Sequence, residues 1–473
     1  MGKINQQDNY QANFGFCLRS SSIFYIPPSP VKTSIVFSNY WKFKNNLEVF
    51  LIANFRNMEG KLIKREKVIF DNKTVVELEI RDGFSGSCEI ESFSNKDLRI
   101  PYSAIMIVYE SAESISMVHS YSRIYSQIEI EDSKVICEGK EGCWTLRDNE
   151  EIESFAVIHN GSNFLQAQEI EFTITNHKGE KKKINYHMRS LKPYETFVVY
   201  PNLIFKNLSN FLEGKEGSGL IHFQLSTSFS RLLVGWQTKN KKELQVTHSN
   251  FDYSSHQTDL IDCEYNFGHM MVPKIDNNNK DVYTIIYPDK SPGKYAISSE
   301  IIKKRKVKNI LDVFQTNPQD LRFQREDGKL PSRIVTAIKI KSKNSNNLPC
   351  ECSLGIMHKM CPKKRFHWGL ISKKFKSKII ITAVKNIFGV PFNSNICLKI
   401  YSQKTDKIIE NNLNWEDISK DGVNGTIDIN NYFNEADIDN DKFMYVSFFS
   451  QYPGFFAYTT LEKGNSFSLE HTF

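Results

Sequence analysis

Four histidines end strand-like segments that recur along the chain. The segments are Ser116-Met-Val-His119, Leu244-Gln-Val-Thr-His248, Ser353-Leu-Gly-Ile-Met-His358 and Phe467-Ser-Leu-Glu-His471. An imidazole titrates near neutral pH and binds metals, so a histidine in every unit could form a ligand-binding site. A histidine at a strand end can instead hydrogen-bond backbone groups at the corner of a sandwich. We favour this structural interpretation, because each unit supplies one histidine with no second ligand at fixed spacing.

Two stretches add further possible ligands to this series. Asp252 and His256 follow His248 closely, which makes that region a candidate metal or small-ligand site. The densest group of soft ligands is Cys350, Cys352, His358 and Cys361. Residues two apart on a strand project from one face, but this spacing is not that of a zinc finger. We therefore favour ordinary thiols there and keep a metal site as the weaker alternative.

Aromatic side chains offer a different kind of site. Sugar-binding sandwiches stack pyranose rings on exposed aromatic residues, and Trp236 and Trp368 are candidates for that role. The competing interpretation is that these rings fill the cores of the sandwiches.

Enzyme signatures are missing from the sequence. The chain has no Gly-x-Ser-x-Gly elbow, no phosphate-binding loop, no His-Glu-x-x-His and no dinucleotide fingerprint. We expect no catalytic residues and no cofactor. The net charge of +7 is spread over short alternations of Lys and Glu, so we also expect no nucleic-acid partner.

The elements that carry the histidines form a repeat. The histidines recur at intervals of about 110 to 130 residues, the size of one small sandwich domain. Period-two alternation, as in residues 169–175, indicates strands that pack on one face. The sequence predicts an all-β protein of tandem antiparallel β-sandwiches, Ig-like or similar to carbohydrate-binding domains, in about four repeats. We expect an N-terminal extension over residues 1–29 and sandwiches over 30–140, 141–265, 281–365 (shorter and degenerate) and 366–473.

The second unit resembles the sensory rhodopsin transducer family. The likeness lies in Cys143-Trp144, His159-Asn160-Gly161, the segment 191–196 and the closing Val246-Thr-His248-Ser-Asn-Phe-Asp252. It covers roughly a quarter of the chain and implies a soluble, oligomeric, non-enzymatic module with a sandwich fold similar to carbohydrate-binding domains. The fourfold repetition departs from the single-domain form of that family, so no partner or binding residue is carried over.

These observations favour a non-catalytic, multi-domain binding or scaffold protein. Repeated modules multiply weak sites, and the aromatic residues favour glycan or glycan-linked material as the ligand. A protein-interaction adaptor or homo-oligomeric scaffold is the first alternative, and a metal-dependent enzyme is the second. Nine cysteines at irregular spacing and the lack of a signal peptide predict a cytoplasmic protein, and no segment is apolar enough to span a membrane.

Overall fold

Alternating apolar and polar residues form antiparallel strands through most of the chain. The computed structural model describes residues 17–472, with gaps at 71–72, 81–82, 96–103, 126–138, 226, 250–266, 276–278, 288–293, 300–301, 309–310, 317–318, 329–334, 356–365, 384–392, 404–407, 432–441 and 453. The described strands form eight sheets, two to each of four sandwiches. The predicted all-β class and fourfold repeat are therefore confirmed.

The first two sandwiches share one strand order and are joined by a shared sheet. In sandwich 1, the sheets β16-β9-β1-β6-β3-β4 and β5-β2-β7-β8 face each other. Its elements are β1 (Cys17–Ile26), β2 (Lys32–Ser38), α2 (Tyr40–Asn45), β3 (Val49–Arg56), β4 (Leu62–Val68), β5 (Val75–Glu79), β6 (Gly86–Ser94), β7 (Ile105–Glu110), β8 (Ile115–His119) and β9 (Ser122–Ile124). Sandwich 2 pairs β10-β15-β12-β13 with β14-β11-β17-β18. Its elements are β10 (Gly139–Leu146), β11 (Ile152–His159), β12 (Gln168–Thr175), β13 (Lys181–Met188), β14 (Thr196–Val199), α4 (Pro201–Ile204), α5 (Leu208–Leu212), β15 (Gly217–Gln224), β16 (Ser228–Ser230), β17 (Leu233–Thr238) and β18 (Leu244–His248).

The third and fourth sandwiches repeat the same strand order. Sandwich 3 pairs β19-β24-β21-β22 with β23-β20-β25-β26, and sandwich 4 pairs β27-β32-β29-β30 with β31-β28-β33-β34. The elements of sandwich 3 are β19 (Phe267–Val272), β20 (Lys280–Ile286), β21 (Tyr295–Ser298), β22 (Arg305–Lys306), β23 (Asp312–Gln315), β24 (Gln319–Arg325), β25 (Val335–Ser342) and β26 (Cys350–Gly355). Those of sandwich 4 are β27 (Phe366–Ser372), β28 (Lys378–Ala383), β29 (Asn395–Tyr401), β30 (Ile409–Asn414), α7 (Trp415–Ile418), β31 (Asn424–Asp428), the 3-10 helix η1 (Ile429–Asn431), β32 (Phe443–Ser450), β33 (Phe455–Lys463) and β34 (Ser466–His471).

Two strands lie outside the ranges predicted for the sandwiches. Strand β1 falls in the predicted extension over 1–29, where it pairs with β6 along its whole length. Strand β19 precedes the predicted start of the third sandwich at 281 and pairs with β24. Because each of these strands is hydrogen-bonded into a sheet of its unit, sandwiches 1 and 3 begin earlier in the chain than the sequence indicated.

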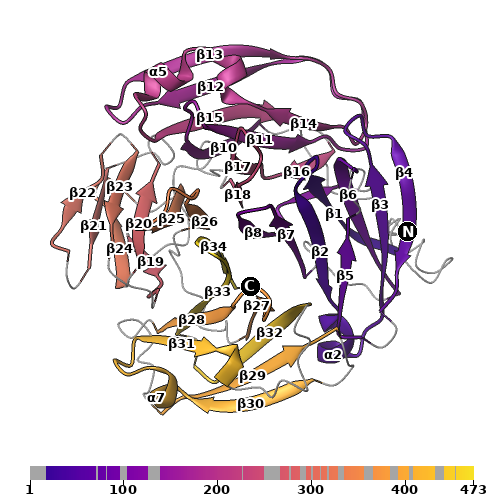
Figure 1. Ribbon diagram of the computed structural model, residues 1–473, viewed down its shortest axis with the longest axis vertical. Coiled ribbons are helices and arrows are strands. Elements are labelled where there is room, and N and C mark those ends of the chain that lie inside the picture. Colours follow the sequence, from indigo (N-terminus) through magenta and orange to yellow (C-terminus); the bar gives the residue numbers. More distant parts are fainter. Residues whose placement is uncertain are drawn as a thin grey trace, which may run out of the picture.

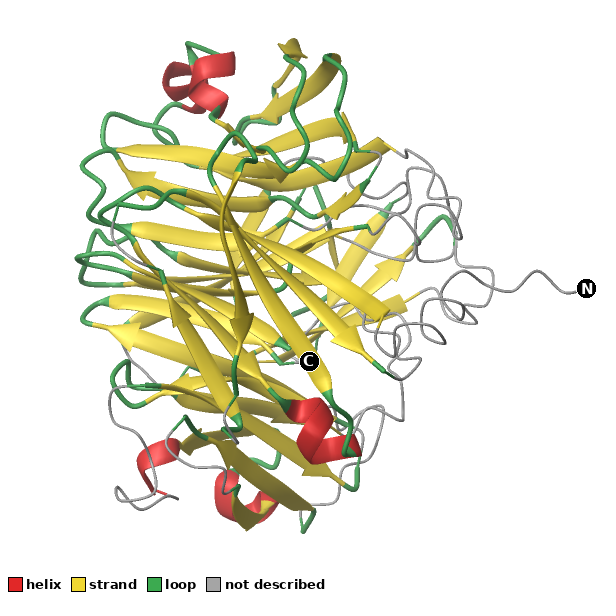
Figure 2. Ribbon diagram, turned by 90° about the vertical axis from the view of Figure 1, so that its right-hand side faces the viewer, coloured by secondary structure: helices red, strands yellow, loops and turns green. Residues whose placement is uncertain are grey.

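The four sandwiches are arranged as a closed ring. Figure 1 looks along the ring axis: β8, β18, β26 and β34 lie at the centre, and β4, β13, β22 and β30 lie at the periphery. Seen from the side, many strands run between the two faces of the ring, so loops gather on those faces (Figure 2). None of the helices in the described parts of the chain is long and apolar enough to cross a membrane.

Apolar cores continue from each sandwich into the next. The core of sandwich 1 includes Val157 and Leu233 of sandwich 2, both fully buried. Met117 of sandwich 1 packs with Tyr445 and Leu461 of sandwich 4 in a separate cluster. Burying one such aliphatic side chain stabilises a fold by about 1.5–3 kcal/mol. The sandwiches are therefore parts of one packed body.

Candidate functional site

The inner strands hold the ring together through side chains that bond to neighbouring backbone. Ser468 of β34 accepts the N–H of Met117 in β8 at 2.9 Å. Ser116 of β8 likewise accepts the N–H of Val246 in β18 at 3.0 Å. These hydroxyls join strands that belong to different sheets, so they fix the register of one sandwich against the next.

Similar hydrogen bonds from side chain to backbone connect β18 with β26 and β26 with β34. Thr247 of β18 accepts the N–H of Ser353 in β26 at 3.2 Å, and the thiol sulfur of Cys350 accepts the N–H of Leu469 in β34 at 3.3 Å. The four inner strands therefore contact one another in a cycle around the axis. Side chains at the ends of β8, β18, β26 and β34 are therefore brought close to the ring axis.

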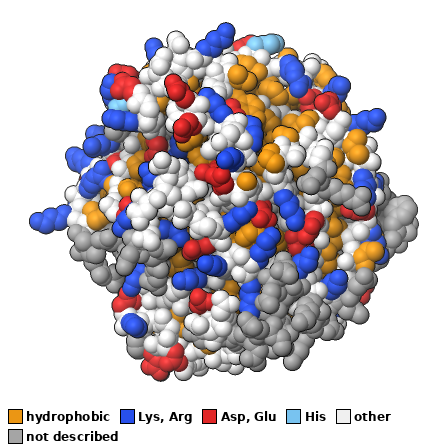
Figure 3. Space-filling model, viewed as in Figure 1, with side chains coloured by type: hydrophobic (Ala, Val, Ile, Leu, Met, Phe, Trp, Pro, Cys, Tyr) orange, Lys and Arg blue, Asp and Glu red, His pale blue; other side chains and the backbone are white. Residues whose placement is uncertain are grey.

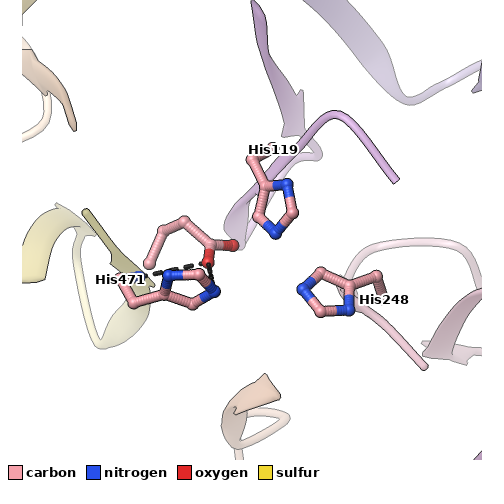
Figure 4. A group of neighbouring side chains, drawn as sticks. His119, His248 and His471 are labelled. Carbon is pink, nitrogen blue, oxygen red and sulfur yellow. Dashed lines mark hydrogen bonds and ion pairs between the residues drawn. The ribbon is translucent and has the colours of Figure 1, made fainter. Parts of the chain in front are cut away.

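Three of the predicted histidines meet there with one carboxylate. His119, His248, Glu470 and His471, here called the axial cluster, each offer a ligand atom, and these atoms all lie within 4.8 Å of one another. The ring centroids of His119 and His248 are 4.5 Å apart, and that of His471 lies 5.3 Å and 6.3 Å from them. Figure 4 shows the three labelled rings directed toward a common point from different strands.

Backbone carbonyl groups orient two of the rings. Nδ1 of His119 lies 2.7 Å from the carbonyl oxygen of Ser120, and Nδ1 of His248 lies 3.1 Å from that of Ser249. A carbonyl oxygen can only accept, so Nδ1 donates in both rings and a neutral ring carries its lone pair on Nε2. The hydroxyl residue after His248 also bonds to the segment just before β17, because Ser249 accepts the N–H of Leu232 at 3.0 Å.

Burial controls the charge of the axial cluster. Burial raises the pKa of Glu470 to about 8, although the backbone N–H of His471 and the charge of Arg231 favour the carboxylate. Burial, and then the neighbouring His248 and His471, hold the pKa of His119 well below its usual range. At neutral pH the cluster therefore has neutral imidazole at His119 and a largely protonated Glu470.

The donor set of the axial cluster suits a transition metal. Three imidazole nitrogens and one carboxylate oxygen are ligands that Zn²⁺ and its neighbours in the first transition series accept in tetrahedral sites. His119, His248 and Glu470 are almost completely buried. Burial of these groups favours a closed, structural site over a catalytic one, which keeps an open position for substrate.

The third sandwich departs from the predicted histidine series. In sandwiches 1, 2 and 4 the terminal histidine pairs with Met106, Leu233 and Tyr458 of the adjacent strand. In sandwich 3 the matching partner is Ala337, which pairs with Ser353. The hydrogen bonds between the inner strands give the same alignment. Ser116 and Cys350 each accept a backbone N–H from an adjacent inner strand, and Ser353 follows Cys350 by three residues just as His119 follows Ser116. Ser353 thus holds the histidine position, and the prediction that His358 is the equivalent residue is wrong; His358 lies outside the described residues.

The other predicted site residues lie away from the axial cluster or outside the described residues. Trp236 is fully buried, and its indole N–H donates to the carbonyl of Thr145 at 2.8 Å. Trp368 is half-buried and packs against Tyr445. Asp252 and His256 lie outside the described residues.

The predicted cysteine site is not assembled from the residues that the structure describes. Cys350 and Cys352 are buried in β26, and both face β34 as the spacing predicted. Burial raises the pKa of the Cys350 thiol to about 12 and that of Cys352 well above its usual range. Within the described ranges these thiols do not join a group of three or more metal ligands, and Cys361 lies in the gap at 356–365.

A second polar cluster joins sandwiches 2 and 3. Arg147 forms ion pairs with Glu351 and, at 2.9 Å, with Glu216, and Lys339 pairs with Glu216 at 2.6 Å. Tyr287 donates to Glu351 at 3.3 Å. Burial opposes ionisation of Glu216, but the charges of Arg147 and Lys339 outweigh it and lower its pKa to about 2.

Glu470 is the member of the axial cluster that the sequence analysis missed. It directly precedes His471, and the matching positions hold Val118, Thr247 and Cys352. Glu470 is thus an acid at a position that is uncharged in the other three sandwiches. That contrast within the repeat was the available signal, because a buried carboxylate is costly unless it has partners.

Comparisons with known proteins assign the chain to no family. No family model matches the chain, and a search of curated proteins also finds no match. Among solved structures, the crystal structure of a tetra-tandem repeat in the extending region of a large adhesion protein aligns over 96% of this chain and 93% of its own. The identity is 6% and the TM-score is 0.13, so this likeness transfers nothing. The molecule is a tandem β-sandwich protein, and its resemblance to sensory rhodopsin transducers stays a prediction.

Proposed function

We propose that this protein is a non-catalytic binding scaffold whose partner is an acidic, extended protein segment. The observation that carries the proposal is the basic character of the outward edge strands. In three sandwiches the peripheral strand or its flank carries exposed Lys or Arg: Lys61, Lys64, Arg65 and Lys67 at β4, Lys181, Lys182 and Lys183 at β13, and Lys303, Lys304 and Lys306 at β22. Lys and Arg side chains also project from the left rim in Figure 3, where β21 and β22 lie.

Edge strands suit this role because their outer backbone groups can pair with another chain. An extended peptide that adds to a sheet edge gains main-chain hydrogen bonds, and cationic side chains beside it favour acidic sequences. Among the strands that the structure describes, β4, β13 and β22 each pair with one neighbour and stand at a sheet edge. The ring holds these three edges in fixed positions, so a partner with several acidic segments gains avidity.

Burial of the tryptophans speaks against glycan binding. Trp41, Trp144, Trp236 and Trp415 are all buried, and Trp368 packs on Tyr445. A sugar platform needs an exposed aromatic face. Burial of the axial cluster likewise gives little support to a metal-dependent enzyme. A protein partner is therefore preferred to glycan.

Binding of a labelled peptide to the full chain tests this proposal. The probe is a fluorescein-labelled peptide of alternating Glu and Val, compared with the same peptide carrying Gln for Glu, by fluorescence polarisation at low ionic strength. We expect saturable binding of the acidic peptide, weakened at least threefold by Lys182→Glu. Lys420→Glu is the matched control, because Lys420 is also exposed but lies on sandwich 4 away from these edges.

Three results would count against the proposal. Equal weakening by Lys182→Glu and Lys420→Glu would mean that net charge alone attracts the peptide. Equal affinity for the Gln peptide would remove the charge argument. Saturable glycan binding on an array, with no binding of the acidic peptide, would replace the protein partner with a sugar.

A further inference from the structure

We propose that the axial cluster binds one divalent transition-metal ion of the zinc class, with His119, His248, His471 and Glu470 as its ligands. The inference goes beyond the scaffold proposal and does not depend on it. Its basis is that ligand atoms from three different sandwiches lie within 4.8 Å of one another. The three rings converge on one point in Figure 4.

The rings of His119 and His248 are held by hydrogen bonds from Nδ1, as the rings of metal-bound histidines commonly are. A metal-bound histidine usually donates its second ring N–H to a carbonyl or carboxylate, which fixes the tautomer and the ring plane. The Nδ1 atoms of His119 and His248 make that bond to Ser120 and Ser249. The same arrangement occurs in two sandwiches, and in both it directs Nε2 toward the axis.

The third sandwich explains why the fourth ligand is a carboxylate. A fourfold repeat would bring four histidines to the axis, but sandwich 3 has Ser353 at that position. Glu470, next to His471, completes a set of three nitrogens and one oxygen. A neutral hydroxyl is a weak ligand, whereas a carboxylate also supplies negative charge to a bound cation.

The chemistry of the cluster selects among metals. Imidazole-rich sites suit Zn²⁺, Cu²⁺ and Ni²⁺, while Mg²⁺ and Ca²⁺ need oxygen ligands. Arg231 lies near enough for its charge to act on both His119 and Glu470. Only an ion that binds nitrogen strongly will outweigh that repulsion. Zn–N bonds of about 2.0–2.1 Å place tetrahedral ligand atoms about 3.3 Å apart, so binding would draw ligand atoms that now lie within 4.8 Å of one another closer by at most about 1.5 Å.

Such an ion would join sandwiches 1, 2 and 4 at one point. Sandwiches 1 and 2 are consecutive in the chain and share a sheet through β9 and β16. Sandwiches 1 and 4 are not consecutive and meet through β8 and β34. The metal would therefore cross-link sandwiches 1 and 4 at the junction that closes the ring.

Metal binding to the full chain, expressed without a histidine tag and stripped with EDTA, tests the proposal. We expect one Zn²⁺ per chain after dialysis, measured by elemental mass spectrometry, and the visible absorption of tetrahedral Co²⁺ on substitution. Zn²⁺ should also raise the melting temperature, because it binds the folded state. His248→Ala should weaken binding at least a hundredfold and Glu470→Gln about tenfold.

The control is His187→Ala, because His187 is exposed on β13, where it pairs with Glu169. This variant should keep the wild-type stoichiometry and affinity. Less than one bound Zn²⁺ in the wild type, or equal losses in His187→Ala and His248→Ala, would overturn the proposal. If His248→Ala does not fold, the nearly isosteric Glu470→Gln decides: wild-type affinity in that folded variant also overturns it.

Discussion

The hydroxyl of Ser114 bonds to both backbone groups of Leu244, although the two residues belong to different sandwiches. It donates to the carbonyl oxygen at 2.9 Å and accepts the N–H at 2.8 Å. The Ser114 side chain thus makes the two backbone hydrogen bonds that a neighbouring strand would make at a sheet edge. Ser116 repeats the arrangement with Val246, so the junction is a ladder of serines.

Ser114→Ala should destabilise the protein by about 2–4 kcal/mol, because it leaves two buried backbone groups of Leu244 without this partner. Chemical denaturation followed by circular dichroism measures the change. Ser209→Ala is the control, since Ser209 is exposed on α5 and should change the stability by less than about 0.5 kcal/mol. Equal effects of the two substitutions would contradict the role assigned to the ladder.

Arg147→Met should destabilise the protein by about 3–5 kcal/mol, because Glu351 is buried and loses its ion pair. Adding Glu351→Gln removes the uncompensated charge and should restore part of the stability. A double-mutant cycle in urea measures the coupling, which we expect to exceed about 1 kcal/mol. Additive effects would show that the two side chains do not interact.

Acid should weaken the junction between sandwiches 2 and 3 through Glu216. Its folded pKa of about 2 lies below the ordinary value of 4.5, so the folded state binds fewer protons than the unfolded state. The stabilisation is complete above about pH 4.5 and is lost as the pH falls toward 2. The free energy of unfolding of the wild type should therefore drop by about 2 kcal/mol more than that of Glu216→Gln between pH 5.5 and pH 2.5. Parallel curves for the two proteins would refute this.

Two glycines with similar backbone angles should respond differently to alanine. Gly60 has φ +82°, and a Cβ there would meet Pro193 and lie 2.8 Å from the backbone nitrogen of Glu195, in the turn that contacts sandwich 2. Gly83 has φ +85° and open space around it. Gly83→Ala should cost about 1–2 kcal/mol from backbone strain alone, and Gly60→Ala should cost at least about 2 kcal/mol more. Thermal melts of both variants check this, and equal losses would show that the turn can move aside.

The sandwiches and three of the axial histidines could be predicted because strand alternation and repeats are local in sequence. The ring could not be derived in the same way, because alternation shows which face of a strand is buried and not what covers it. One signal was present: residues 104–109 form a continuous apolar run, as expected for a strand covered on both faces. In β7, Ile107 packs inside sandwich 1 while Met106 and Val108 face sandwich 4.

His358 was misassigned for a related reason. Sequence spacing placed a histidine near the end of the third unit, but strand pairing sets the register, and Ser353 holds the equivalent position. A shift of five residues is invisible in a degenerate repeat. Only the partner across the sheet, Ala337, reveals it.

The closing junction between sandwiches 1 and 4 also constrains how the protein is made. Sandwich 1 leaves the ribosome before sandwich 4, yet its apolar residues Val36, Met106 and Met117 are covered by sandwich 4. While translation continues, that surface is exposed to water and to other nascent chains. Slow elongation should therefore favour aggregation or chaperone capture of partly synthesised chains, and the exposed surface disappears when β34 reaches β8.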